Sequence, residues 1–80
     1  MYYIYLLRSL KNLSKTYIGY TTNLDQRLET HNSGGSIHTS KDRPWKMVMY
    51  LAFDSEQKAL DFEKYIKIGS GYAFAKKRFW

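Results

Sequence analysis

Residues 16–32, TYIGYTTNLDQRLETHN, contain the change of pattern that decides the fold. Five of the first six residues are aromatic or β-branched, which is typical of a strand. Leu24 and Leu28 then recur at helical spacing. Thr22 can cap this helix, with Asp25 in the pattern of a capping box, and the glycines of NSGG can end it in left-handed geometry. We therefore expect a strand followed at once by a helix.

The rest of the chain supplies two more strands and two more helices. In chain order we expect strands over residues 2–10, 16–21 and 45–53, and helices over residues 22–32, 55–68 and 72–80. Asp54 is expected to cap the second helix and GSG to stop it, and SGGSIHTSKDRP is expected to be a flexible, basic loop. This β-β-α-β-α-α order predicts an α+β fold, in which helices flank a small three-stranded antiparallel sheet.

The composition indicates one small domain, expected to span residues 1–80. Cysteine is absent, and thirteen Lys plus Arg against seven Asp plus Glu leave a net charge of +6. The lack of cysteine fits a reducing cytoplasm, and we expect neither a signal peptide nor a membrane-spanning segment. The positive charge fits a polyphosphate partner such as nucleic acid.

Polar residues occupy places in both long helices where packing residues are expected. Arg27 and His31 fall on the same stripe as Leu24 and Leu28, and Glu63 falls on the inward stripe of the second helix. The apolar members of that second stripe are Ala59, Phe62 and Ile66. Because an unpaired buried charge is costly, the three polar residues suggest a shared polar site. The alternative is a half-buried structural ion pair between Arg27 and Glu63, with His31 favoured by the helix dipole.

The first two strands add tyrosines and an unexpected glycine. Tyr3 and Tyr5 share one strand face, and Tyr17, Gly19 and Thr21 share one face of the next strand. Packing alone explains most single tyrosines. Gly19 weakens a strand interior, which indicates close approach by another backbone or a ligand.

The tripeptides YIY at residues 3–5 and YIG at residues 17–19 resemble the two halves of the GIY-YIG nuclease signature. Arg27 and Glu63 are similar to the remaining core motifs of that family. The resemblance covers nearly the whole chain and is closest to the short, single-domain bacterial branch. Tyr3 stands where the first triplet of the family name has Gly, and the C-terminal Asn of some members is absent.

The resemblance implies a catalytic role for five residues. Tyr5 and Tyr17 would be the tyrosines of the two triplets, Arg27 the essential arginine, and His31 a histidine seen in several branches. Glu63 would be the ligand of a single Mg²⁺ or Mn²⁺ ion.

These residue types suit phosphodiester hydrolysis. One carboxylate holding a metal and one arginine can stabilise the phosphoryl group and the leaving oxygen. A tyrosine of pKa about 10 is a poor base, so a neighbouring cation must lower its pKa. We expect His31 or Lys41 to do so.

Two basic segments could contact phosphates on either side of the site. The expected nucleic-acid contacts are His38, Lys41 and Arg43 in the loop and Lys76, Lys77 and Arg78 in the last helix. Contacts of this kind position DNA without reading its sequence. For each residue alone, an ordinary solvated surface is the competing interpretation.

The leading hypothesis is a metal-dependent DNA endonuclease of the kind used in DNA repair, structure-selective or weakly sequence-specific. RNA is not excluded as a substrate, no membrane partner is expected, and the protein is expected to be a monomer or a weak homodimer. One alternative is a non-catalytic nucleic-acid-binding module with the same fold. The other is a small basic structural or partner-binding domain.

Overall fold

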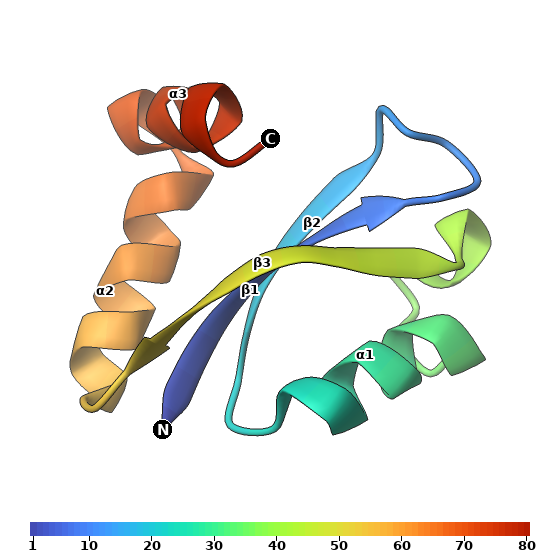
Figure 1. Ribbon diagram of the computed structural model, residues 1–80, viewed down its shortest axis with the longest axis horizontal. Coiled ribbons are helices and arrows are strands. Elements are labelled where there is room, and N and C mark those ends of the chain that lie inside the picture. The colour runs from blue at the N-terminus through green and yellow to red at the C-terminus, as the bar shows by residue number, and fades with distance from the viewer.

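The computed structural model describes residues 1–80 as one three-stranded antiparallel sheet with three helices (Figure 1). The strands are β1 (Tyr2–Ser9), β2 (Thr16–Thr21) and β3 (Trp45–Phe53), and the helices are α1 (Leu24–Ser33), α2 (Glu56–Lys67) and α3 (Gly69–Arg78). The strand order is β2-β1-β3, so β1 is central and β2 forms one edge. The predicted α+β class and element order are confirmed.

Both predicted helix caps are wrong by one residue. Asn23, not Thr22, caps α1 and accepts a hydrogen bond from the N–H of Gln26 at 3.1 Å. Ser55, not Asp54, caps α2. A capping side chain must lie three residues before the N–H that it accepts, and each cap adopts the extended backbone that this geometry requires. Gly34 ends α1 at φ 85°, as expected.

The third helix begins earlier than the sequence suggests. α2 ends at Lys67, but α3 starts at Gly69, so GSG forms the first turn of α3. Ile68, in extended conformation, separates the two helices. A single residue is therefore enough to change the direction of the chain.

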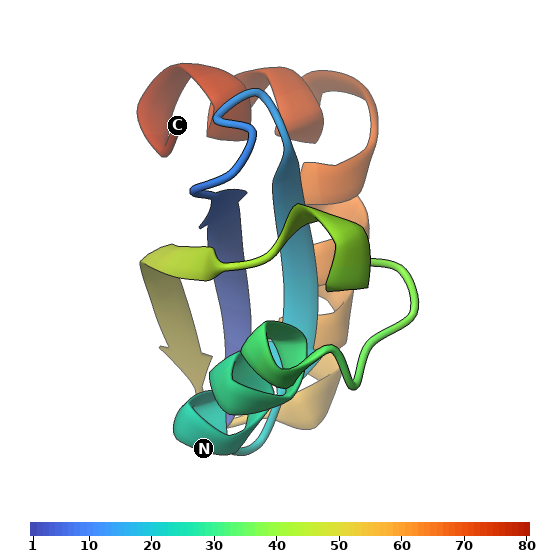
Figure 2. The ribbon, with the colours of Figure 1, turned by 90° about the vertical axis from the view of Figure 1, so that its right-hand side faces the viewer.

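The helices cover opposite faces of the sheet. Ile4 and Leu6 of β1 pack against Ala59 and Ile66 of α2 and against Ala75 of α3. Their neighbours Tyr5 and Leu7 point to the other face and form a second cluster with Trp45, against which two leucines of α1 pack. Figure 2 shows α1 in front of the sheet and α2 behind it.

The loop between α1 and β3 is more ordered than expected. Ser40–Asp42 form a 3₁₀ turn, and Thr39 is buried. The Trp45 indole donates to the Thr39 carbonyl at 2.8 Å, and Asn32 both donates to and accepts from the Trp45 backbone. These bonds hold the loop against the Tyr5 face of the sheet, which corrects the expectation of a flexible loop.

Gly19 makes room for the side chain of Tyr5. The two residues are paired across β1 and β2, and a Cβ at position 19 would lie 2.3 Å from the Tyr5 hydroxyl. The close approach predicted at Gly19 is therefore made by a side chain of the same sheet. It lets the Tyr5 phenol extend over the edge strand.

No helix of the structure combines the length and the apolar character needed to cross a membrane.

We expect Gly19→Ala to destabilise the fold by about 1–3 kcal/mol, because the new methyl group overlaps the Tyr5 phenol. Urea unfolding followed by tryptophan fluorescence measures this change. Gly35→Ala is the matched control, because its new methyl group would lie 3.0 Å from Thr30 Cγ2, so a shift of a few tenths of an ångström is enough to accommodate it. Equal losses for the two variants would show that the Tyr5 contact is not the cause.

Candidate active site

A chain of hydrogen bonds connects Tyr5 of the central strand to the last turn of α1. The Tyr5 hydroxyl lies 2.9 Å from His31 Nε2, and His31 Nδ1 lies 2.7 Å from Thr39 Oγ1. All three side chains are buried. Both ring nitrogens have a partner, so the imidazole is fixed in orientation, and in its neutral form one nitrogen donates while the other accepts.

The surroundings disfavour the charged forms of both Tyr5 and His31. Burial raises the pKa of Tyr5, Tyr17 and Glu63 raise it further, and the Arg27 guanidinium lowers it only in part. Burial also lowers the pKa of His31, and Arg27 adds to this effect. A lowered pKa makes His31 less able to supply a cation, and Arg27 is the cation whose charge lowers the pKa of Tyr5.

Tyr17 completes an aromatic cluster at the edge of the sheet. Its ring centroid lies 6.2 Å from that of Tyr5 and 5.0 Å from that of His31. Tyr17 is half-buried, whereas Tyr5 is only 1% exposed. Of the two triplet tyrosines, Tyr17 is the one that solvent can reach.

Arg27 and Glu63 approach this cluster from opposite faces of the sheet. Both affect the pKa of Tyr5, although Arg27 lies on α1 and Glu63 on α2. The charges of both residues therefore act on Tyr5 from opposite faces of the sheet, so the expected residues do not gather on one face. Arg27 is also exposed and not buried, because α1 directs it to the rim of the sheet.

The ion pair proposed as the structural alternative is not formed. Glu63 Oε2 instead accepts from Lys67 Nζ at 3.0 Å, one turn later on α2. This is the one ion pair of the structure, so Arg27 has no carboxylate partner. The guanidinium is free to bind an anion from outside.

The donors at Glu63 suit a hard divalent cation with few protein ligands. No cluster of three His, Cys, Asp or Glu side chains exists that would enclose a metal. The Glu63 side chain is 20% exposed, and a single carboxylate supplemented by water and phosphate oxygens is a common Mg²⁺ environment. The residues therefore fit one magnesium-like ion.

The predicted basic contacts form two separate groups. His38, Lys41 and Arg43 are exposed on the loop that packs on the α1 side, and Arg43 lies over Gly34. Lys76, Lys77 and Arg78 are exposed on α3, which packs on the opposite side. The sheet separates the two groups.

Two residues of the site, Thr39 and Lys67, were not predicted from the sequence. Thr39, which fixes His31, lies in a loop without any periodic signal. Lys67, which binds Glu63, follows it at the i+4 spacing of helical ion pairs and was identifiable from that spacing.

The chain belongs to the GIY-YIG catalytic domain family, whose model matches residues 1–72. This confirms the predicted class, a GIY-YIG nuclease domain. The nucleases of this family are metal-dependent in general.

The chain is 44% identical over 69 residues to structure-specific endonuclease subunit SLX1 of Podospora anserina, covering 79% of this chain and 20% of that protein. It is 46% identical over 68 residues to the slx1 subunit of Talaromyces marneffei, covering 78% and 18%. It thus spans about a fifth of the length of these relatives.

A solution NMR structure of a UPF0213 protein from Bacillus halodurans has a similar fold. The TM-score is 0.57 and the sequence identity is 28%, covering 99% of this chain and 87% of that one.

We expect the stability of the protein to fall as the pH drops below about 6.5. The pKa of His31 is lowered in the fold, so below that pH the unfolded chain binds more protons than the folded one. The contribution of His31 to stability is fully present above the pKa that it has in the unfolded chain. This contribution is lost as the pH falls towards its lower pKa in the folded protein. Melting temperatures between about pH 5 and pH 8 measure this slope.

His31→Gln should flatten this pH dependence, because glutamine can hydrogen-bond but does not titrate. His38→Gln removes an exposed histidine and should leave the slope unchanged. If the two variants flatten it equally, His31 is not its source.

Proposed function

We propose that this domain is a metal-dependent endonuclease that hydrolyses phosphodiester bonds of DNA. The observation that carries the proposal is that Tyr17, Arg27 and Glu63, each on a different element, all shift the pKa of Tyr5 in β1. The centroid of the Tyr17 ring lies 6.2 Å from that of the Tyr5 ring. Nothing in the packing requires an unpaired arginine beside two tyrosines and a carboxylate. Hydrolysis of a phosphodiester needs a positive charge, a group that accepts a proton and a ligand for a metal ion. These needs account for all four side chains.

The proposed roles follow from exposure and charge. Arg27 binds the phosphoryl oxygens of the scissile phosphate through its planar fork. Tyr17 orients the attacking water. As the oxygen–phosphorus bond forms, the water gives its proton to the Tyr5 hydroxyl, which passes its own proton to His31 Nε2. The oxygen–phosphorus bond to the leaving group breaks, and the leaving oxygen takes a proton from solvent. Tyr5, which is buried and protonated, positions His31.

Glu63 is the proposed ligand for Mg²⁺ or Mn²⁺. When bound, such an ion neutralises charge on the phosphoryl group and assists the leaving oxygen. Lys67 occupies one oxygen of Glu63, Oε2, and the other oxygen is available to the ion.

The same Lys67–Glu63 pair favours a second candidate, a DNA-binding module that does not cleave. A carboxylate already neutralised by a lysine has less affinity for a cation. Turnover with added Mg²⁺ or Mn²⁺ distinguishes the two functions.

A branched or otherwise distorted DNA is the proposed substrate. The support is that the similar proteins of Podospora anserina and Talaromyces marneffei are structure-specific endonuclease subunits. Incubation of the protein with supercoiled, branched and single-stranded DNA, in Mg²⁺, Mn²⁺ or chelator, tests this proposal directly.

We expect Glu63→Gln to abolish metal-dependent nicking while changing stability by no more than about 0.5 kcal/mol. The change removes a partly exposed i,i+4 pair, and no buried partner is left unpaired. Melting temperature and nicking of supercoiled plasmid are measured side by side. Glu29→Gln, an exposed change on α1, is the control. A large loss of stability with unchanged nicking would reject the metal-ligand role.

We expect Arg27→Lys to reduce nicking by about 10²-fold with little change in stability, because Arg27 is exposed and lysine cannot form the bidentate contact. Arg27→Gln should also raise the pKa of His31, since the guanidinium lowers it. NMR titration of His31 measures this shift in both variants. An unchanged His31 pKa in Arg27→Gln would place the guanidinium away from the site.

A further inference from the structure

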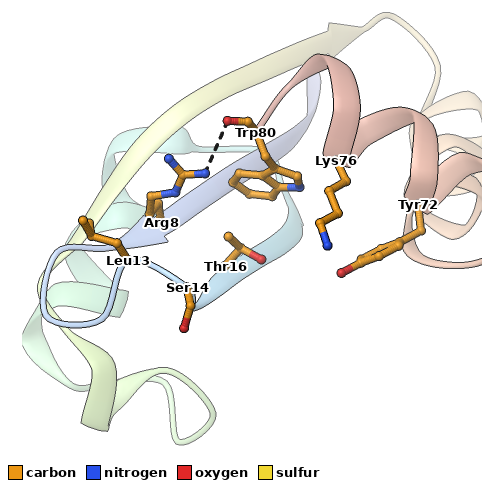
Figure 3. A pocket seen from close by; sticks show the side chains of 7 residues that line it. All are labelled: Arg8, Leu13, Ser14, Thr16, Tyr72, Lys76 and Trp80. Carbon is orange, nitrogen blue, oxygen red and sulfur yellow. Dashed lines mark hydrogen bonds between the residues drawn. The ribbon is translucent and has the colours of Figure 1, made fainter.

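A polar cavity separate from the candidate active site lies between α3 and the turn that joins β1 to β2. Its volume is about 300 Å³, and Figure 3 shows its lining residues: Arg8, Leu13, Ser14, Thr16, Tyr72, Lys76 and Trp80. Tyr72 and Lys76 stand one turn apart on α3, and both point towards the β2 strand (Figure 3). The cavity contains two cations and two aromatic rings.

Arg8 retains unused hydrogen-bonding capacity in this cavity. Its Nη2 makes one long bond, 3.4 Å to the Trp80 carbonyl, and its buried Nε has no partner. The guanidinium also lies 5.8 Å from the centre of the Trp80 ring. An arginine has five donors, so most of those on Arg8 are available to an acceptor that enters the cavity.

No acidic side chain balances these cations. The single ion pair of the structure joins Lys67 to Glu63, so neither Arg8 nor Lys76 has an Asp or Glu partner. Neither this cavity nor the one on the other side of Arg8, which Lys46 lines, contains an Asp or Glu. Positive charge concentrated without counter-charge is the pattern of a phosphate-binding surface.

The cavity continues towards the candidate active site. A neighbouring cavity of about 220 Å³ shares Thr16 and Tyr72 with it and is also lined by Tyr17 and Lys67. Tyr17 belongs to the aromatic cluster with Tyr5 and His31, and Lys67 binds the proposed metal ligand Glu63. A continuous basic and aromatic path therefore runs along β2 from the site to α3.

We propose that this path binds a single-stranded segment of the polynucleotide substrate, with unpaired bases against Tyr72 and Trp80 and phosphates on Arg8 and Lys76. Tyr72 is 47% exposed, and an exposed aromatic face stacks on any base without reading its sequence. The cavity volume is in the range that accepts a small organic group such as one nucleotide. A paired base presents only its edge and cannot stack there.

This inference rests on the proposed nuclease function and narrows its substrate. A strand that leaves the scissile phosphate along β2 must be unpaired to reach Tyr72, so the preferred DNA carries a single-stranded arm beside the cut. Lys67 lies at the start of this path, next to Tyr17. Its ammonium group can leave the ion pair with Glu63 and bind a phosphate of the incoming strand instead.

The test is binding of a fluorescent oligothymidylate to the whole 80-residue chain in chelator, measured by anisotropy over a range of salt concentrations. Tyr72→Ala should weaken binding by roughly 5-fold to 100-fold, and Tyr72→Phe should retain it, because stacking needs only the ring. Lys76→Gln should reduce the slope of log K against log salt by about 0.7. Lys58→Gln, an exposed lysine on α2 outside these cavities, is the matched control.

Each outcome decides the proposal. Binding that is unaffected by Tyr72→Ala, or weakened equally by Lys76→Gln and Lys58→Gln, overturns it. Equal competition by polyglutamate would show a general polyanion surface and also overturn it, whereas oligouridylate in place of oligothymidylate tells whether RNA shares the path. Because no cleavage takes place in chelator, failure here leaves the nuclease proposal standing, and loss of nicking in Glu63→Gln leaves this one standing.

Discussion

The hydrogen bond between the Tyr5 hydroxyl and His31 Nε2 is the constraint on which the rest of the site depends. It places three polar side chains, Tyr5, His31 and Thr39, in the interior of a domain of 80 residues with few fully buried apolar ones. Such groups are tolerable only when each has a partner. The position of α1, the fold of the loop after it and the glycine in β2 all serve to provide those partners.

The site lies at a sheet edge for a simple geometric reason. A three-stranded sheet has one interior strand, and its helices cover opposite faces, so side chains from α1 and α2 can approach each other only around an edge. Side chains of β2 contact both helices: the centroid of the Tyr17 ring lies 5.0 Å from that of the His31 ring of α1, and the Tyr20 hydroxyl donates to Glu56 of α2 at 2.8 Å. Gly19 removes the one side chain that would block the Tyr5 phenol, which brings the interior of the sheet into contact with that edge.

The sequence predicts the regular elements well and the relations between them poorly. The bounds of β2 and β3 follow from runs of aromatic and β-branched residues, and they agree with the structure. Helical periodicity shows that His31 and Glu63 face the sheet, but it does not tell which sheet face each helix covers. It therefore could not predict that Arg27 and Glu63 act on Tyr5 from opposite faces, nor that Arg27 would stay at the rim. Thr39 is set by tertiary bonds alone, to which no local pattern corresponds.

The arrangement of charge connects stability to function. Of the thirteen Lys and Arg side chains, only Lys67 forms an ion pair, and the net charge is +6 on a chain of 80 residues. Surface ion pairs would contribute little in any case, but this excess produces repulsion that opposes the compact state. A polyanion that binds only the folded domain relieves that repulsion and stabilises it by mass action. Arg8, Arg27 and Lys76 have no Asp or Glu partner. They are therefore a cost to the free domain, and on the proposed binding path they become a source of affinity for phosphates.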